Sequence, residues 1–233
     1  MPFYVFDSGK ALPSTNRHHF WEIFSVPRVA PCVTALGKLA PRSLDIKTGW
    51  DFTNKQHVAN LVNDLNAYRP LCVLTCPPCT TMSQLMACNW WRMNREKREA
   101  QAKQGMSFVD LSVEIWNFQL KCNHFYIFEH PKGSLVWQRD NVKEVPGDEV
   151  TFDQCMLGLK APGQDGNYIK KRATIKTNVP GLANALRQYQ CHGRHTHQRV
   201  EGNFNGVKLS TYSAHYPPEM CAVLASHISR LGK

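Results

Sequence analysis

Hydrophobic and polar positions follow one another along the chain in blocks that predict short strands and helices. Apolar residues at helical spacing predict a helix over residues 54–68, with Asn54 as its N-cap and Pro70 just beyond its end. Continuous apolar runs at residues 71–75 and 124–128 are typical of strands buried on both faces of a parallel sheet.

The remaining blocks extend this alternation of strand and helix. Further strands are expected at residues 21–25, 43–46, 149–156 and 173–177, and further helices at 92–123, 181–189 and 218–231. Strands alternating with helices predict an α/β fold with an open, mostly parallel sheet flanked by helices. We expect residues 1–20 to form a loose N-terminal arm and residues 21–233 a single domain, with residues 150–215 as a Cys- and His-containing subregion.

Composition and charge narrow the class of protein. The length of 233 residues suits one domain, and 42% hydrophobic residues with six Trp exclude a mostly disordered chain. No apolar run reaches the roughly 18–20 residues of a membrane span, and the first residues lack a signal-peptide pattern. The net charge of +10 suggests a polyanionic partner such as nucleic acid, and the alternative is a basic surface that only keeps the protein soluble.

Cysteine usage indicates the compartment. The chain has nine Cys, an odd number without the rhythm of a secreted scaffold. We expect an intracellular, reducing compartment (nucleus or cytoplasm), where thiols bind metals or react.

Two candidate chemical groups follow the two apolar strands. Cys76-Pro-Pro-Cys79 comes after the first of these strands and Glu129 after the second. Ligands of open α/β sheets bind at the carboxyl ends of the strands, so we expect Cys79 to face Glu129 there. A thiol paired with an acid suits addition to an electron-poor ring. The alternatives are a redox or metal-binding Cys-x-x-Cys pair, a buried structural thiol, and an ordinary surface carboxylate at Glu129.

These residues carry a resemblance to a known family. Pro77-Pro78-Cys79, followed four residues later by Ser83, resembles the nucleophile motif of cytosine-5 DNA methyltransferases, and Glu129 matches the acid of that family's Glu-Asn-Val motif. Residues 22–25 occupy the place of its glycine-rich first motif, and residues 50–53 are similar to its Gly-Asp-Ile-Thr segment. The resemblance covers residues 22–129, about half of the chain, and residues 170–175 resemble the Arg-rich strand that follows.

The resemblance implies a class I, Rossmann-like methyltransferase fold that uses S-adenosylmethionine to methylate carbon 5 of cytosine, in DNA rather than RNA. Cys79 would add to ring carbon 6, Glu129 would share a proton with the ring nitrogen, and Lys170 or Arg172 would stabilise the base. The residues implied to bind the cofactor are Phe24, Ser25, Val26, Pro27, Arg28, Asp45, Asp51 and Pro77. The alternatives are a catalytically degenerate methyltransferase fold that serves as a nucleic-acid-binding or scaffold module, and a methyltransferase acting on RNA.

The chain departs from the family pattern in four places. The first motif has no glycine in residues 24–28, Asp45 and Asp51 are only six residues apart, and Glu129 is followed by His-Pro instead of Asn-Val. Only 61 residues follow Arg172, too few for the family's large target-recognition domain. We therefore expect a divergent, compact branch of the family, with a protein partner as one source of target recognition.

A segment after the nucleophile motif has the composition of a nucleic-acid contact. By the resemblance it is a mobile loop that closes over DNA, with Trp rings stacking on bases and Arg side chains neutralising phosphates. The candidate residues are Ser83, Trp90, Trp91, Arg92, Arg95 and Arg98. The alternative is a solvated, basic helix face.

Soft and borderline metal ligands gather in the last third of the chain. Cys191, His195 and His197 lie within seven residues, and Cys155 would complete four tetrahedral ligands for a structural Zn²⁺. The alternative is a polar surface loop whose His and Arg side chains contact phosphate.

Overall fold

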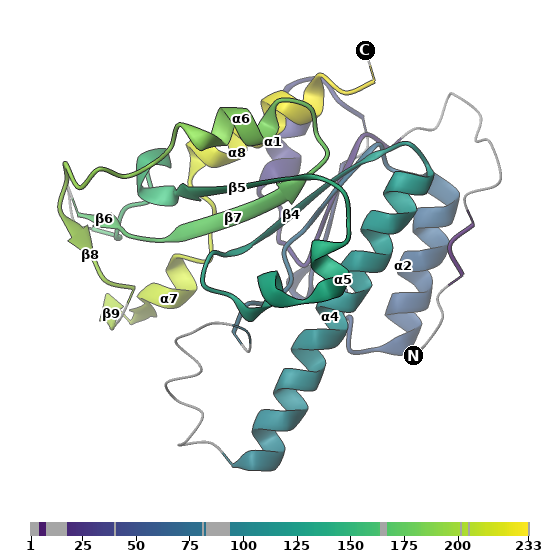
Figure 1. Cartoon of the computed structure of the whole chain (residues 1–233), viewed down its shortest axis with the longest axis horizontal. Coiled ribbons are helices and arrows are strands. Elements are labelled where there is room, and N and C mark those ends of the chain that lie inside the picture. Colours follow the sequence, from purple (N-terminus) through teal and green to yellow (C-terminus); the bar gives the residue numbers. More distant parts are fainter. Residues whose placement is uncertain are drawn as a thin grey trace.

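A six-stranded sheet forms the centre of the computed structural model, which describes residues 5–7, 18–39, 41–80, 82, 94–163, 167–200, 202–204 and 206–232 (Figure 1). The strand order is β2-β1-β3-β4-β7-β5, in which β2, β1, β3 and β4 are parallel and β7 is antiparallel to both of its neighbours. The strands are β1 (Phe20–Ile23), β2 (Arg42–Leu44), β3 (Cys72–Thr75), β4 (Phe125–Pro131), β5 (Asp148–Asp153) and β7 (Arg172–Thr177). The expected α/β class with a mostly parallel sheet is confirmed, and the topology is compatible with a Rossmann-like fold.

Helices cover both faces of this sheet (Figure 1). On one face α1 (Val29–Ala35), α6 (Leu182–Arg187) and α8 (Pro218–Ser229) bury their apolar sides against the strands. On the other face lie α2 (Lys55–Tyr68), α4 (Arg95–Lys121) and the short α5 (Asp140–Lys143). Successive strand residues point to opposite faces, so both faces of the central strands contribute to a core.

Several element boundaries differ from the sequence-based expectation. β1 begins at Phe20, inside the segment expected to be an arm, and a 3-10 turn (Ile46–Thr48) replaces the end of the expected strand 43–46, because the Asp45 side chain caps it. β4 runs to Pro131 because β7 pairs with residues 129–131. Glu129 therefore lies within the strand and not after it. The sequence pattern also missed α1, which begins shortly after a proline of an apparent turn region.

A smaller structure, here called the Cys/His lobe (the described residues among 154–172 and 188–216), extends from one end of the sheet, at the left of Figure 1. It comprises a 3-10 helix (Gln154–Leu157), the parallel pair β6 (Tyr168–Ile169) and β8 (His197–Gln198), the hairpin β9 (Asn203–Phe204) and β10 (Val207–Lys208), and α7 (Leu209–Tyr212). Its own apolar core has three buried residues, Leu159, Ala161 and Ile169.

Among the described residues of the chain, no helix combines the length and apolar character needed to cross a bilayer.

Candidate functional site

The strand order creates a switch point between β1 and β3. From β1 the chain adds β2 on one side and later adds β3 on the other, and ligands of such sheets bind where the two connections diverge. The predicted cofactor segment, residues 24–28, follows β1, and the Cys76–Cys79 turn follows β3. A hydrogen bond from the Cys76 N–H to the Ile23 carbonyl (3.1 Å) joins the two segments, so the structure brings both predictions to the same edge.

The Cys79 thiol is half-buried near Glu129 and Lys171. Burial raises the pKa of Cys79; the Lys171 ammonium lowers it and the Glu129 carboxylate raises it, and the sum is a pKa above the ordinary value. The thiol therefore keeps its proton at neutral pH in the ligand-free protein. A nucleophilic Cys79 would lose that proton only once a substrate is bound.

Glu129 is buried and held by Tyr216, a residue that no sequence motif singles out. The Tyr216 hydroxyl donates to Oε2 of Glu129 (2.9 Å), and the Cys76 Sγ lies 2.8 Å from the same hydroxyl. Burial, with Cys76 and Glu129 nearby, raises the pKa of Tyr216 well above its ordinary value, so the hydroxyl keeps its proton. The other carboxylate oxygen, Oε1, is buried and has no hydrogen-bond partner among the described residues.

The three basic residues of the segment 170–172 point to different places. Lys170 is exposed, and Arg172 forms a bidentate pair with the fully buried Asp153 carboxylate (2.8 and 3.1 Å). Burial alone would raise the pKa of Asp153, but the hydrogen bonds from Arg172 and from the Cys191 N–H hold it below its ordinary value. Lys171 interacts electrostatically with Cys79, while its Nζ donates to the Ser213 carbonyl (2.8 Å). Of the three, Lys171 is the one whose charge acts on the thiol, whereas the sequence favoured its two neighbours.

His130, next to Glu129 on β4, is a second buried polar residue that the sequence did not suggest. It is fully buried, and neither ring nitrogen has a partner among the described residues. Burial, and then the charge of Lys171, lower the pKa of His130 to about 3, so the ring is neutral at physiological pH.

The turn after β1 is organised by Glu22, whose side chain is completely buried. Its Oε1 accepts from the N–H groups of Arg28 (2.9 Å) and Ala30 (3.2 Å) and from the Ser43 hydroxyl (2.7 Å). Its Oε2 accepts from the Val29 N–H and the Ser25 hydroxyl, both at 3.2 Å. A protein carboxylate therefore occupies the start of α1, the place where many α/β proteins bind a phosphate.

The predicted cofactor residues line this edge of the sheet in different environments. Ser25 and Pro77 are buried, Val26 and Arg28 are half-buried, and Pro27 is exposed. Phe24 adopts a left-handed backbone conformation (φ 60°) and packs against Phe52 with ring centroids 4.8 Å apart. The Arg28 guanidinium lies over the Tyr216 ring, 5.4 Å from its centroid, which links the turn to the Glu129–Tyr216 pair.

The two predicted acids, Asp45 and Asp51, lie at the end of β2. The Trp50 N–H donates to the Asp45 carbonyl (2.9 Å), which folds the intervening residues into one compact turn. The Asp45 side chain caps the 3-10 turn through the Lys47 N–H (2.9 Å). Hydrogen bonds from the hydroxyl and the N–H of Thr53 lower the pKa of Asp51, whose neighbours on the chain are the rings of Trp50 and Phe52.

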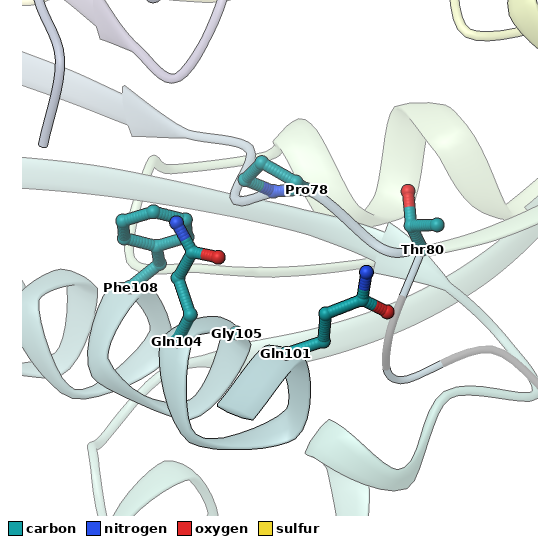
Figure 2. Close-up of a pocket in the computed structure, with 6 residues that line it drawn as sticks. All are labelled: Pro78, Thr80, Gln101, Gln104, Gly105 and Phe108. Atoms are coloured by element: carbon teal, nitrogen blue, oxygen red, sulfur yellow. The ribbon is translucent and has the colours of Figure 1, made fainter. Parts of the chain in front are cut away.

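A pocket of about 270 Å³ lies between the Cys79 turn and α4 (Figure 2). Pro78 and Thr80, on either side of Cys79 in the chain, form one wall, and the α4 residues Gln101, Gln104, Gly105 and Phe108 form the other. Gly105 presents no side chain there, so α4 leaves space opposite the turn. The described lining of the pocket is uncharged, with two amide groups, one hydroxyl and one aromatic ring.

The predicted nucleic-acid segment is described only in part. Ser83, Trp90, Trp91 and Arg92 lie outside the described residues. Arg95 is exposed in the first turn of α4 and pairs with Glu99 (2.7 Å), and Arg98 is half-exposed one turn further along.

The four predicted metal ligands come together in the Cys/His lobe. The ligand atoms of Cys155, Cys191, His195 and His197 all lie within 4.8 Å of one another. The Cys191 Sγ is 3.6 Å from Nε2 of His195 and 3.4 Å from Nε2 of His197, and the two Nε2 atoms are 2.9 Å apart. Cys155 is buried and the other three are half-buried. This cluster could hold a metal ion.

Comparison with known proteins does not assign the chain to a family: no family model matches it, and neither does any curated protein. The geometry of the sheet edge and of the Cys/His cluster therefore carries the functional interpretation.

Proposed function

We propose that this chain is an S-adenosylmethionine-dependent methyltransferase that acts on carbon 5 of cytosine in nucleic acid, with DNA preferred. The observation that carries the proposal is the position of Cys79 and Glu129 at neighbouring strands beside the switch point. There Cys76 and Glu129 share the Tyr216 hydroxyl, and the charges of Glu129 and Lys171 act on the Cys79 thiol. A thiol, an acid and a cation around one point are the groups required for nucleophilic addition to a pyrimidine ring.

In the proposed reaction the flipped-out cytosine lies between Cys79 and Glu129. The Cys79 proton passes through Glu129 to the ring nitrogen, and the Lys171 ammonium stabilises the sulfur as its charge develops. The sulfur forms a bond to ring carbon 6 as the double bond between carbons 5 and 6 gives up its electron pair. The unpartnered Oε1 of Glu129 is the oxygen suited to share a proton with the ring nitrogen, because Oε2 already accepts from Tyr216. Carbon 5 would then take the methyl group of S-adenosylmethionine, with S-adenosylhomocysteine as the leaving group. The carbon 5 proton would pass to solvent. Cys79 would leave as a thiol, taking back the proton of the ring nitrogen through Glu129, which restores the aromatic ring.

The sheet edge supports a cofactor without phosphate groups. S-adenosylmethionine supplies an electrophilic methyl group and carries no phosphate, whereas the N–H groups at the start of α1 are already bound by Glu22. Asp45, at the end of β2, is in the position where an acid binds the ribose hydroxyls in comparable sheets. The rings of Phe24 and Phe52 offer an apolar surface for the adenine.

For the metal cluster we propose Zn²⁺ in a structural role. With Zn–S of about 2.3 Å and Zn–N of about 2.0–2.1 Å, a tetrahedron has S···N edges of about 3.5–3.6 Å and N···N edges of about 3.3–3.4 Å. The two S···N distances, 3.6 and 3.4 Å, are close to these values, and the N···N distance of 2.9 Å requires only a small outward shift. Four protein ligands leave no open position, which favours a structural over a catalytic ion.

Incubation of the protein with labelled S-adenosylmethionine and either duplex DNA or RNA tests the enzymatic proposal. We expect label in 5-methylcytosine of DNA, its loss in Cys79→Ala, and its retention in Cys122→Ala, a half-buried thiol remote from the sheet edge. Label in RNA alone would favour the RNA methyltransferase, and absence of both transfer and cofactor binding would favour a degenerate nucleic-acid-binding or scaffold module.

Metal analysis of the purified protein tests the zinc proposal separately. We expect one equivalent of zinc, its absence in Cys191→Ser, and its retention in Cys122→Ser. Equal zinc content in the two variants would contradict the assignment.

A further inference from the structure

The Cys/His lobe carries a large share of the positive charge of the chain. The two segments that form it, residues 154–172 and 188–216, have seven Lys and Arg against two acidic residues, a net charge of +5, which is half of the +10 of the whole chain. Six of the seven basic residues are exposed: Lys160, Lys170, Arg172, Arg194, Arg199 and Lys208. The two acids, Asp165 and Glu201, lie outside the described residues.

Among the described residues, carboxylates leave most of this charge unpaired. Elsewhere in the described chain, basic side chains pair with acids, as in Arg42–Asp64 and Arg139–Asp110. In the lobe only Arg172 forms an ion pair with a described acid, and its partner Asp153 is buried beneath it. The other exposed cations of the lobe form no ion pair with a described acid, and a surface with this excess of positive charge attracts a polyanion.

The lobe is attached directly to the site that contains Cys79. Lys171 belongs to the lobe, and its Nζ donates to the Ser213 carbonyl (2.8 Å). The charge of the Lys171 ammonium acts on the Cys79 thiol. Asp153, at the end of β5, binds both Arg172 and the Cys191 N–H (2.9 Å), so the metal-ligand loop and the segment beside the thiol share one anchor. A polyanion bound on the lobe would therefore contact a unit that is anchored to the Cys79 site.

We propose that the Cys/His lobe is the surface on which a DNA duplex docks through its phosphates. The choice of DNA rests on the proposed function, whereas the polyanion character rests on the charge of the lobe. The lobe's own cluster of buried apolar residues consists of Leu159, Ala161 and Ile169, a small core for its short strands. The metal cluster supplies the missing constraint, because it joins the segments that carry Cys155, Cys191 and β8.

Arg194 and Arg199 are the residues that test this inference most cleanly. Both are exposed, flank the His195 and His197 ligands without being ligands, and form no ion pair with a described acid. The double variant Arg194→Gln/Arg199→Gln removes two charges from the lobe. The control variant, Lys121→Gln/Arg230→Gln, removes the same charge away from the carboxyl ends of the strands. Lys121 ends α4, after which the chain enters β4, and Arg230 ends α8, which packs near the start of β1.

The experiment measures the affinity of the full-length, zinc-loaded protein for a fluorescent 20-base-pair duplex, without cofactor, over a range of salt concentrations. Removal of one phosphate contact lowers the slope of log K against log salt by about 1, so we expect the slope of the lobe variant to fall by about 2 and its affinity about tenfold. The control variant should keep the slope of the unmodified protein. Zinc content and melting temperature verify that both variants fold.

An unchanged slope in the lobe variant would overturn the inference, as would a failure of the unmodified protein to bind the duplex. Tighter binding to an RNA duplex or to polyglutamate would also overturn it, because the preferred partner would then be of another class. Methyl transfer is measured separately. A reduced slope in the lobe variant without any methyl transfer would support the docking surface and contradict only the proposed reaction.

Discussion

The buried carboxylate of Glu22 provides a quantitative test of how the site edge is built. Glu22→Gln replaces one carboxylate oxygen by an amide group of nearly the same size, so packing is preserved while hydrogen bonding changes. If the amide oxygen takes the place of Oε1, it keeps the three donors there. The amide nitrogen then meets the Val29 N–H, which is left without an acceptor.

The expected cost follows from these contacts. A buried N–H without an acceptor costs about 1–3 kcal/mol, and the remaining bonds weaken because their acceptor is no longer charged. Neutralising a buried carboxylate also relieves part of its desolvation cost, so we expect a total loss of about 3 kcal/mol. For a chain of 233 residues this corresponds to a fall in Tm of roughly 6–12 °C.

Urea unfolding followed by fluorescence of the buried Trp21 and Trp116, and by circular dichroism, measures the free energy of unfolding. Coincident transitions by the two probes establish two-state behaviour. The control is Glu99→Gln on the exposed surface of α4, which should cost less than about 0.5 kcal/mol. If the two variants differ by less than about 1 kcal/mol, Glu22 does not organise the turn as described.

Three further predictions concern the site and its surroundings. Tyr216→Phe should lower the kcat of methyl transfer about tenfold, with little change in the KM for S-adenosylmethionine, because it removes the hydroxyl bound to Glu129. Tyr126→Phe removes another buried hydroxyl and should leave kcat unchanged. Lys171→Gln should lower the transfer rate more than Lys170→Gln, and equal effects would argue against the role of Lys171. Burial, and then the charge of Asp110, raise the pKa of Glu114 to about 7, so the folded state holds this proton more tightly than the unfolded state. The free energy of unfolding should therefore fall as pH rises from about 5 to 8. Urea titrations of Glu114→Gln should no longer show this pH dependence.

The sequence predicts those parts of the fold in which local pattern and tertiary packing agree. The helix 55–68 has four buried apolar residues at helical spacing and an Asn54 cap, and it forms as expected. α1 lacks such a pattern, because a carboxylate from the preceding strand satisfies its first N–H groups. The two-residue strands β6 and β8 are too short for any periodic signal and are held by contacts within the lobe.

The same reasoning separates the predicted from the missed site residues. Cys79 and Glu129 follow or end apolar runs, so a rule about strand ends finds them. Tyr216 is 87 residues from Glu129 and 140 from Cys76 in the chain, and only the folded sheet reveals the contact. Lys171 is one of three consecutive basic residues, and this pattern does not encode which of the three side chains acts on the thiol.

The most direct test of the central claim is covalent trapping of Cys79. Fluorine at carbon 5 of cytosine cannot leave as a proton, so the proposed addition to carbon 6 would stop at a stable bond between the thiol and the base once the methyl group is transferred. We therefore expect mass spectrometry of the protein, incubated with S-adenosylmethionine and DNA containing 5-fluorocytosine, to find one adduct on the peptide that contains Cys79, and none in Cys79→Ala. Absence of an adduct with bound DNA and cofactor, or an adduct on another cysteine, would contradict the account.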